Sequence, residues 1–457
     1  MGRLWPLTIR GTGAVLLGLV CLVVAADRGV VELLYVAMLL FAVVAAAVGS
    51  LYVVRRADGL ARTVEPDVLT VGQEGRVTVR VSVRAAVASG PGTWRDALSP
   101  GLAWRSDTAG DGEAVTGQGG SIGRGAGTGT IARLRRSARR AAPGTSAAHG
   151  VFPALDSGLR GEAHTVDVDY RIVGTRRGMH TLGPLAVSSI DPFGLVRRTH
   201  VLSERTRVVV APEVVDLPPL TDLPGEAGGS RHTSSNELGQ GSDNLIPRAY
   251  APGDSMRRIH WRASAHRDEL MVRQEEQEST PAATVVLDLA TGRFSPHAMR
   301  GAGLDDGFES ALSACVSIVA RLVREGYTVA VIDSDGRALA DPIEGGDLAE
   351  VEALGTSFAT LVTRRDDHLA ELAPLFTGAL SGPLVVIVGR FDGADAATLA
   401  PVAHHSSLPL LFAVSPVDDA LPRAAAHGWR VAPIPPGGDL VPAWQQAVER
   451  EVGHVVA

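Results

Sequence analysis

The chain opens with two long apolar runs. Residues 11–26 carry no charge, and after a three-residue connection a second run, residues 30–54, holds a single acidic side chain. A helix needs about 20 apolar residues to cross the bilayer core. The second run has that length and the first reaches it with a flanking turn, so the pattern predicts two transmembrane helices that form a hairpin anchor over residues 1–56.

Basic residues flank this hairpin on both sides. Arg3 and Arg10 precede it, and Arg55, Arg56 and Arg62 follow it. By the positive-inside rule they predict a multi-pass protein of the cell membrane with both termini in the cytoplasm. A cleaved signal peptide is the alternative interpretation of the first run, but the second run would still anchor the chain after cleavage.

Beyond the apolar runs the pattern changes to a period of two. Residues 76–83 alternate polar side chains with valine, and residues 166–172 alternate in a similar way. Alternation of this kind predicts half-buried strands, and several short strands at this spacing predict a β-sandwich over residues 57–220. Residues 106–150 interrupt it with glycine, alanine, serine, threonine and a few arginines, which predicts a disordered insertion.

From residue 284 onward apolar runs alternate with helical stretches. The runs are 284–289, 328–332, 383–388 and 408–414, and the helices include 308–325 and 441–452. Strands without polar alternation are buried on both faces, which is typical of a parallel sheet covered by helices. Residues 284–457 are therefore expected to form one α/β domain with a mainly parallel sheet.

Composition removes several function classes. The formal net charge is −7, so the chain lacks the basic surplus of nucleic-acid-binding proteins. It contains no lysine, which a Walker A loop and a pyridoxal phosphate enzyme both require. Cys21 and Cys315 lie far apart in apolar or helix-like stretches and are expected to be buried hydrophobes rather than a disulfide.

A dense motif occupies residues 221–283, between the two soluble domains. Its members are Arg248, Tyr250, Pro252, Gly253, Asp254, Ile259, His260, Trp261, Arg262, Ser264, Ala265, Leu270, Val272, Arg273 and Glu276. Pro252 and Gly253 predict a turn, and Asp254 is suited to cap a helix that begins at Ser255. Residues 270–273 read as a strand.

These residues resemble the hallmark of the family called domain of unknown function 58. Residues 191–195, Asp-Pro-Phe-Gly-Leu, and the hairpin anchor also resemble that family's architecture, whereas the glycine-rich insertion departs from it. The resemblance implies a von Willebrand factor type A-like carboxy-terminal region and no established enzymatic activity. It also implies a companion of the MoxR type among the AAA+ ATPases.

Domains of the type A kind hold a divalent cation through Asp-x-Ser-x-Ser after the first strand. The equivalent run here, residues 288–292, begins with Asp288 but has alanine and glycine at both serine positions. We therefore expect no competent metal site and no other cofactor. Residues 333–336 read as an acidic turn after the next strand.

Asp254 and His260 invite interpretation as an acid/base pair, but six positions apart on a helix they do not face each other well, and no nucleophile is visible nearby. A structural or interaction role is favoured for the motif residues. The leading expectation is a non-catalytic, membrane-anchored interaction or adaptor protein with a cytoplasmic binding surface, whose partners are the lipid bilayer and a cytosolic protein. A membrane-associated hydrolase using Asp254 and His260, and a cation-dependent adhesion module built on Asp288, are the alternatives.

Overall fold

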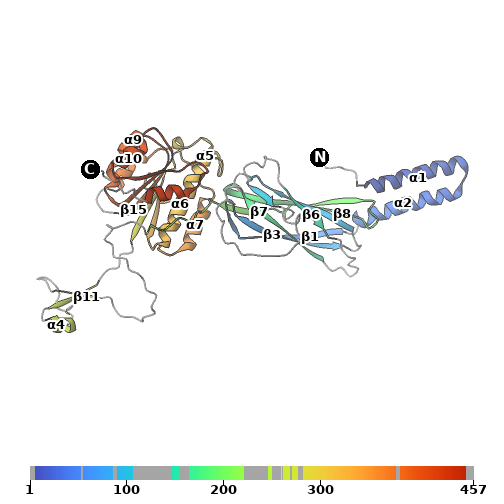
Figure 1. Ribbon diagram of the computed structural model, residues 1–457. Helices are drawn as coiled ribbons and strands as arrows, with labels where there is room; N and C mark the ends of the chain where they lie inside the picture. Colours follow the sequence, from blue (N-terminus) through green and yellow to red (C-terminus); the bar gives the residue numbers. More distant parts are fainter. Residues whose placement is uncertain are drawn as a thin grey trace, which may run out of the picture.

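The computed structural model describes residues 6–52, 55–85, 90–105, 147–153, 164–220, 245–249, 259, 261–267, 270–275, 281–376 and 381–448. Figure 1 shows a pair of long helices at one end of a β-sandwich and an α/β domain at the other end. The two amino-terminal apolar helices and the parallel carboxy-terminal sheet agree with the predictions from the sequence.

The anchor consists of α1 (Ile9–Arg28) and α2 (Val31–Tyr52). Gly29 ends α1 at a φ of 69°, where its N–H donates to the Ala25 carbonyl and where a side chain would be strained. Only 11% and 17% of the apolar windows of the two helices are buried. The core helix of a soluble protein would be mostly buried, so this exposed apolar pair indicates a membrane protein.

The sandwich has two sheets that enclose one apolar core. In order across the first sheet, the strands are β1 (Arg55–Glu65), β3 (Glu74–Ala85), β7 (His164–Gly174) and β5 (Leu102–Arg105). The second sheet contains β2 (Val68–Thr70), β10 (Thr206–Ala211), β8 (Gly178–Ile190), β4 (Gly90–Leu98) and β6 (Ala147–Phe152), with β9 (Arg197–Leu202) paired to β8. The alternating valines of β3 and β7 point into this core, as their period of two predicts.

The predicted insertion extended too far at its end. Residues 147–150 belong to β6, which pairs with β4, and Ala148 lies in the core. The composition of this strand, rich in alanine and glycine, does not distinguish it from the preceding linker. The rest of the predicted insertion, residues 106–146, lies outside the described residues.

A buried polar trio joins the two sheets of the sandwich. The Arg62 guanidinium on β1 donates to both carboxylate oxygens of Asp96 on β4 at 3.1 Å, and the Tyr170 hydroxyl on β7 donates to the same carboxylate at 2.8 Å. Burial, followed by the nearby charge of Asp96, raises the pKa of Tyr170. Because Arg62 and Asp96 are almost fully buried, their mutual pairing is required to offset the loss of hydration.

The α/β domain is built on a five-stranded sheet in the order β14 (Thr328–Asp333), β13 (Ala282–Leu287), β15 (Ser381–Phe391), β16 (Ser406–Pro416) and β17 (Arg430–Pro433). Every neighbouring pair is parallel. One face packs on α6 (Asp306–Arg324), α7 (Leu348–Phe358) and α11 (Leu440–Val448). The other packs on α8 (Leu372–Leu375), α9 (Gly393–Ala403) and α10 (Ala420–Ala426), so the sheet is covered on both sides (Figure 1).

The structure confirms the prediction that Cys315 is a buried hydrophobic residue. It lies in the middle of α6 with no exposed surface, and burial raises the pKa of its thiol to about 12. A thiol in that state is not a nucleophile at neutral pH.

A buried arginine joins the sandwich to the α/β domain, in addition to the contact between α7 and β10. Arg177, in the turn between β7 and β8, is fully buried and donates to both carboxylate oxygens of Glu309 on α6 at 2.8 Å. It also donates to the carbonyl of Phe358 at the end of α7, and its guanidinium lies 5.7 Å from the centroid of the Phe308 ring. We call Arg177 with Glu309, Phe308 and the Phe358 carbonyl the domain joint.

Removal of the domain-joint arginine is expected to destabilise the protein. Arg177→Ala removes the cation paired with Glu309 and the donor to the Phe358 carbonyl, at a cost of about 3 kcal/mol, the lower end for a buried pair because Glu309 keeps the Gly303 N–H and some contact with solvent. The corresponding fall in melting temperature is roughly 6–12 °C in detergent. Arg176→Ala, at the exposed neighbouring position, should change the melting temperature little. Equal effects of the two substitutions would contradict the role assigned to Arg177.

Candidate functional site

The main polar cluster of the α/β domain lies where the central strands end. Asp288 follows β13 directly, Asp333 is the last residue of β14, and Arg390 lies near the end of β15. The helix after β13 covers one face of the sheet and the helix after β15 covers the other. The carboxyl end of β13 is therefore a topological switch point, the place where open α/β sheets usually bind ligands.

Asp288 is the most enclosed member of this cluster. Its Oδ1 accepts hydrogen bonds from the Ala290 N–H at 3.1 Å and the Ser334 hydroxyl at 3.2 Å. Its Oδ2 lies 3.2 Å from Nε of Arg293, an ion-pair distance, but no donor is aligned for a hydrogen bond with that oxygen. Burial raises the pKa of Asp288 to about 7 against the opposing effect of the Arg293 charge.

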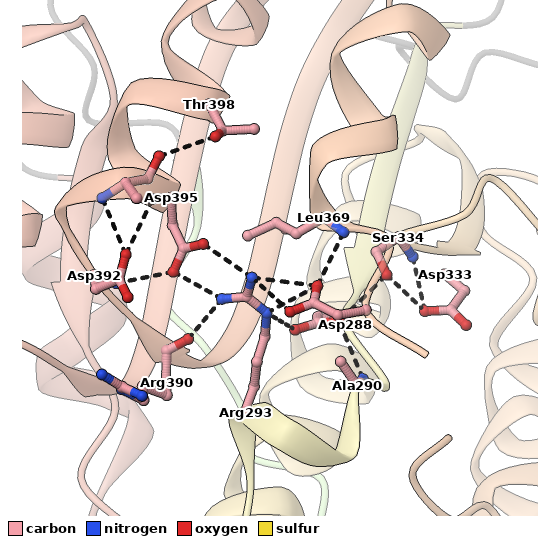
Figure 2. A network of polar contacts seen from close by, with 12 residues as sticks. Asp288, Ala290, Arg293, Asp333, Ser334, Leu369, Arg390, Asp392, Asp395 and Thr398 are labelled. Carbon is pink, nitrogen blue, oxygen red and sulfur yellow. Dashed lines mark hydrogen bonds and ion pairs between the residues drawn. The ribbon is translucent and has the colours of Figure 1, made fainter. Parts of the chain in front are cut away.

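Arg293 occupies the centre of the cluster, between Asp288 and Asp395 in Figure 2. Two of its nitrogens donate to the two carboxylate oxygens of Asp395 at 2.8 and 2.9 Å, and one also donates to the Arg390 carbonyl at 3.0 Å. Asp367 accepts at 3.2 Å from the remaining side. Although burial alone lowers the pKa of Arg293, its hydrogen bonds to Asp395 and the nearby Asp288 carboxyl raise that pKa above its ordinary value, so the guanidinium stays charged.

Local structure holds Arg293 in this position. It ends the short 3-10 helix η4 (Thr291–Arg293), whose first residue donates both its N–H and its hydroxyl to the Arg364 carbonyl at 2.6 Å. On the other side Gly389 of β15 lies against the Arg293 carbonyl so closely that a Cβ would collide with it. Asp395 is held by a capping box with Asp392 at the start of α9.

A second ion pair completes the group. The Arg364 guanidinium lies 3.0 Å from Oδ2 of Asp333, while the other oxygen of that carboxylate accepts from the Ser334 N–H at 2.7 Å. The predicted acidic turn at 333–336 is present, with Gly336 at a φ of 79°. We call Asp288, Arg293, Asp333, Arg364, Asp367 and Asp395 the sheet-edge cluster.

The sheet-edge cluster does not fit a divalent cation. Ala290 and Gly292 offer no side-chain oxygen beside Asp288, and the Arg293 guanidinium lies in contact with the carboxylates that would have to converge on a metal. Within the described residues no group of three or more His, Cys, Asp or Glu side chains is arranged to hold a metal. A positive side chain supplies here the charge that a cation would bring.

Sequence reasoning singled out Asp288 and missed its partners. Asp367 and Asp395 follow Arg293 by 74 and 102 positions, and only the parallel order of the strands brings them together. The sequence near Asp288 does contain Arg293, directly after the run 288–292. An arginine at that position does not by itself reveal which carboxylates accept its hydrogen bonds.

The described motif residues belong to β11, α4 and β12 and none of them is a member of this cluster. Arg248 lies on β11 (Leu245–Ala249) and Arg273 on the antiparallel strand β12 (Met271–Glu275), which confirms the strand predicted at 270–273 with a start one residue later. The exposed Trp261 begins α4 (Trp261–Arg267), which includes Arg262, and the Ser264 hydroxyl accepts from the Met271 N–H at 2.8 Å.

Of the helix predicted from Ser255, the structure describes Ile259 and the residues from Trp261 onward. Ile259 is buried in an isolated β-bridge, and the helical residues start at Trp261. Leu270, just before β12, is half-exposed. The remaining motif positions, Tyr250, Pro252, Gly253, Asp254, His260 and Glu276, lie outside the described residues, and so does the proposed pairing of Asp254 with His260.

Comparison with known families identifies one match. Residues 247–360 match the family described as "Protein of unknown function DUF58". This confirms the resemblance over the motif segment and extends it through the first half of the α/β domain to α7. No curated protein matches the chain.

Solved structures add little. The chain is similar to the C-terminal domain of wzt, with 11% identity, 35% of this chain and 78% of that chain covered, and a TM-score of 0.17. For the sporulation control protein Spo0M from Bacillus subtilis the identity is 10%, the coverage 34% and 49%, and the TM-score 0.15. Scores this low carry no argument about fold or function.

The raised pKa of Asp288 predicts a pH dependence with a definite sign. The folded protein holds this proton up to about pH 7, whereas the unfolded chain loses it near pH 4, so stability falls as pH rises between these values, by up to about 1.4 kcal/mol per unit. Asp288→Asn has no titrating carboxyl at this position, so its stability relative to the wild type should increase as pH rises from 5 to 7. Melting temperatures in that range check this. The exposed control Asp419→Asn should follow the wild type, and parallel curves for Asp288→Asn would contradict the assignment.

Loss of Arg293 tests which cation the sheet-edge cluster is built for. Arg293→Ala leaves the Asp395 carboxylate without its bidentate partner and should cost about 3 kcal/mol, whereas Arg423→Ala, in an exposed pair with Asp419, should cost less than about 1 kcal/mol. Low concentrations of guanidinium ion should restore part of the melting temperature of Arg293→Ala, and magnesium should not. A rise in melting temperature with magnesium, in the wild type or the variant, would show that these residues hold a divalent cation.

Proposed function

We propose that this chain, whose residues 247–360 carry the DUF58 family segment, is a non-catalytic membrane-anchored adaptor that presents the carboxyl edge of its α/β domain to a protein partner. The observation that carries the proposal is the closure of the switch point by Arg293. A position where α/β sheets usually receive a small ligand is filled by a side chain of the chain itself.

The internal pairing of the sheet-edge cluster supports binding over catalysis. Asp395 and Asp333 use their carboxylates on Arg293, Arg364 and backbone N–H groups. A general acid or base must lie within hydrogen-bonding reach of the substrate group whose proton it transfers. Asp288, whose pKa lies near 7, has no exposed surface, so it is not presented to one.

The outer rim of the same edge offers charged groups to a partner. Arg365, Asp366 and Arg390 are exposed, and Asp367 retains about half of its side-chain surface although it contacts Arg293. Both signs of charge are interspersed there, on the segment between α7 and the 3-10 helix Leu369–Glu371 and at the end of β15. Such a surface suits a protein with a complementary polar face, because charge patterning sets specificity and association rate.

The partner proposed is an AAA+ ATPase of the MoxR type, and the proposed side of the membrane is the cytoplasm. The first rests on the family resemblance and the second on the arginines that flank the hairpin. Both belong to one hypothesis, because a cytosolic ATPase reaches the α/β domain only if that domain lies on the inner side.

Charge reversal at the rim tests the proposed surface. Asp366→Arg combined with Arg390→Glu should reduce recovery of the ATPase with the detergent-solubilised, full-length protein by roughly tenfold, equivalent to about 1.4 kcal/mol of binding free energy. Recovery is quantified by mass spectrometry after crosslinking in intact membranes.

The matched control is Glu344→Arg, an exposed position beside the first residue of β14 and therefore at the opposite edge of the sheet. It should leave recovery unchanged. Failure to recover any such ATPase with the unmodified protein, in independent preparations, would reject the partner. Equal loss with the control would reject the surface.

A further inference from the structure

The turn 191–196 is built against the two anchor helices. The Thr8 hydroxyl donates to the Gly194 carbonyl at 2.6 Å, and the Thr8 N–H donates to the Leu195 carbonyl at 2.8 Å. The Arg197 N–H donates to the Pro6 carbonyl at 2.7 Å. Residues 6–8 thus form a short antiparallel pairing with residues 195–197, which we call the membrane joint.

The membrane joint also contacts the side of the helices. Val196 and Ala47 of α2 are fully buried against each other, with Leu7, Val48 and Leu195 around them. On α1, Gly11 lies so close to the Leu195 carbonyl that a Cβ would collide with it. The turn therefore reaches past the start of α1 and past the last turn of α2.

Asp191 makes this turn rigid. It is buried, and its carboxylate accepts hydrogen bonds from the Phe193 N–H at 2.9 Å and from the Val196 N–H. Gly194 follows at a φ of 72°, a conformation that favours glycine. The shape of the turn does not rely on its most apolar side chain, because Phe193 is 60% exposed.

Helix length places the turn at the lipid boundary. The helices have 20 and 22 residues, which corresponds to about 30–33 Å and matches the thickness of a bilayer core of about 30 Å. Residues 9–11 and 47–52 must then lie near the edge of the core, and the turn that contacts them lies at the same depth. A phenyl ring exposed at that level can bury itself at the boundary of head groups and acyl chains, as Trp, Phe and Leu side chains of interfacial segments do.

We propose that Phe193, together with the 94% exposed Ile9, inserts into the head-group region of the membrane and fixes the sandwich to the lipid surface. The guanidinium of Arg10 lies beside Gly194, and Arg197 is exposed at the end of the turn. These two charges select anionic lipid phosphates, since each basic group close to the surface adds about 1 kcal/mol of attraction. The inference rests on the proposed membrane anchor and adds a second, lipid-binding contact to it.

Depth-dependent quenching tests the insertion. Cysteine replaces Phe193, Leu16 in the middle of α1, or Met179, an exposed residue at the far end of β8, one at a time in full-length protein whose two native cysteines are alanine. Each thiol carries an environment-sensitive fluorophore, and the protein is reconstituted in phosphatidylcholine–phosphatidylglycerol vesicles with nitroxide-labelled lipids. The label at 193 should lose fluorescence most to nitroxides at the head group or upper acyl chain, a depth of about 5–10 Å. The label at 16 should lose fluorescence to nitroxides deep in the acyl chains. The label at 179 should not be quenched by nitroxides at either depth.

The three labels distinguish failure of the Phe193 insertion from failure of the anchor. Quenching at 16 without quenching at 193 would overturn the insertion while the anchor stands, and absence of quenching at 16 would reject the anchor itself. Phosphatidylcholine alone should weaken quenching at 193, and Arg10→Gln with Arg197→Gln should remove that lipid dependence. Quenching that ignores lipid charge would overturn the role of the two arginines. An unchanged melting temperature for the labelled variants confirms that they are folded.

Discussion

The arrangement of this protein depends on the buried contact between Arg177 and Glu309. Through it the turn between two sandwich strands is held against α6 and α7, the helices that cover one face of the parallel sheet. A fully buried guanidinium tolerates no loss of partners, so the contact resists partial opening. The α/β domain is consequently held at a defined position on a sandwich that is itself held on the anchor by residues 6–8 and 195–197.

The same device recurs at three places where separate parts of the chain meet. Arg62 with Asp96 joins the sheets of the sandwich, Arg177 with Glu309 joins the domains, and Arg293 with its aspartates closes the edge of the parallel sheet. The chain has no lysine, but composition alone does not explain these positions. A planar guanidinium with five donors binds a carboxylate through two parallel hydrogen bonds, and a lysine ammonium offers no equivalent geometry.

Patterns confined to one element were predictable from the sequence. Three such patterns were the amino-terminal apolar runs, the alternating valines of β3 and the continuous apolar strands β13 to β16. Each pattern lies within one stretch of the sequence, and the structure has helices or strands at those places. Strands β4 to β6 lack this signal, because glycine, alanine and polar residues fill them. The sheet-edge cluster was predictable only at Asp288, since its other members meet through strand order rather than through spacing along the chain. Ile259 is a case where a local pattern misled. The spacing of the residues around it predicted a helix, but Ile259 lies in a β-bridge.

A divalent cation site and an arginine-closed site differ in what they can do for a partner. A metal with an open coordination position binds an acidic side chain from outside, so its affinity depends on the ion. Arg293 has carboxylate or carbonyl contacts from Asp288, Asp367, Arg390 and Asp395, and it therefore has little capacity left for an external carboxylate. The proposed partner would therefore contact the rim around the cluster, while Arg293 joins the ends of β13 and β15 to the segment that follows α7. Under that proposal, charge on the rim and not the metal content of the site determines which partner binds.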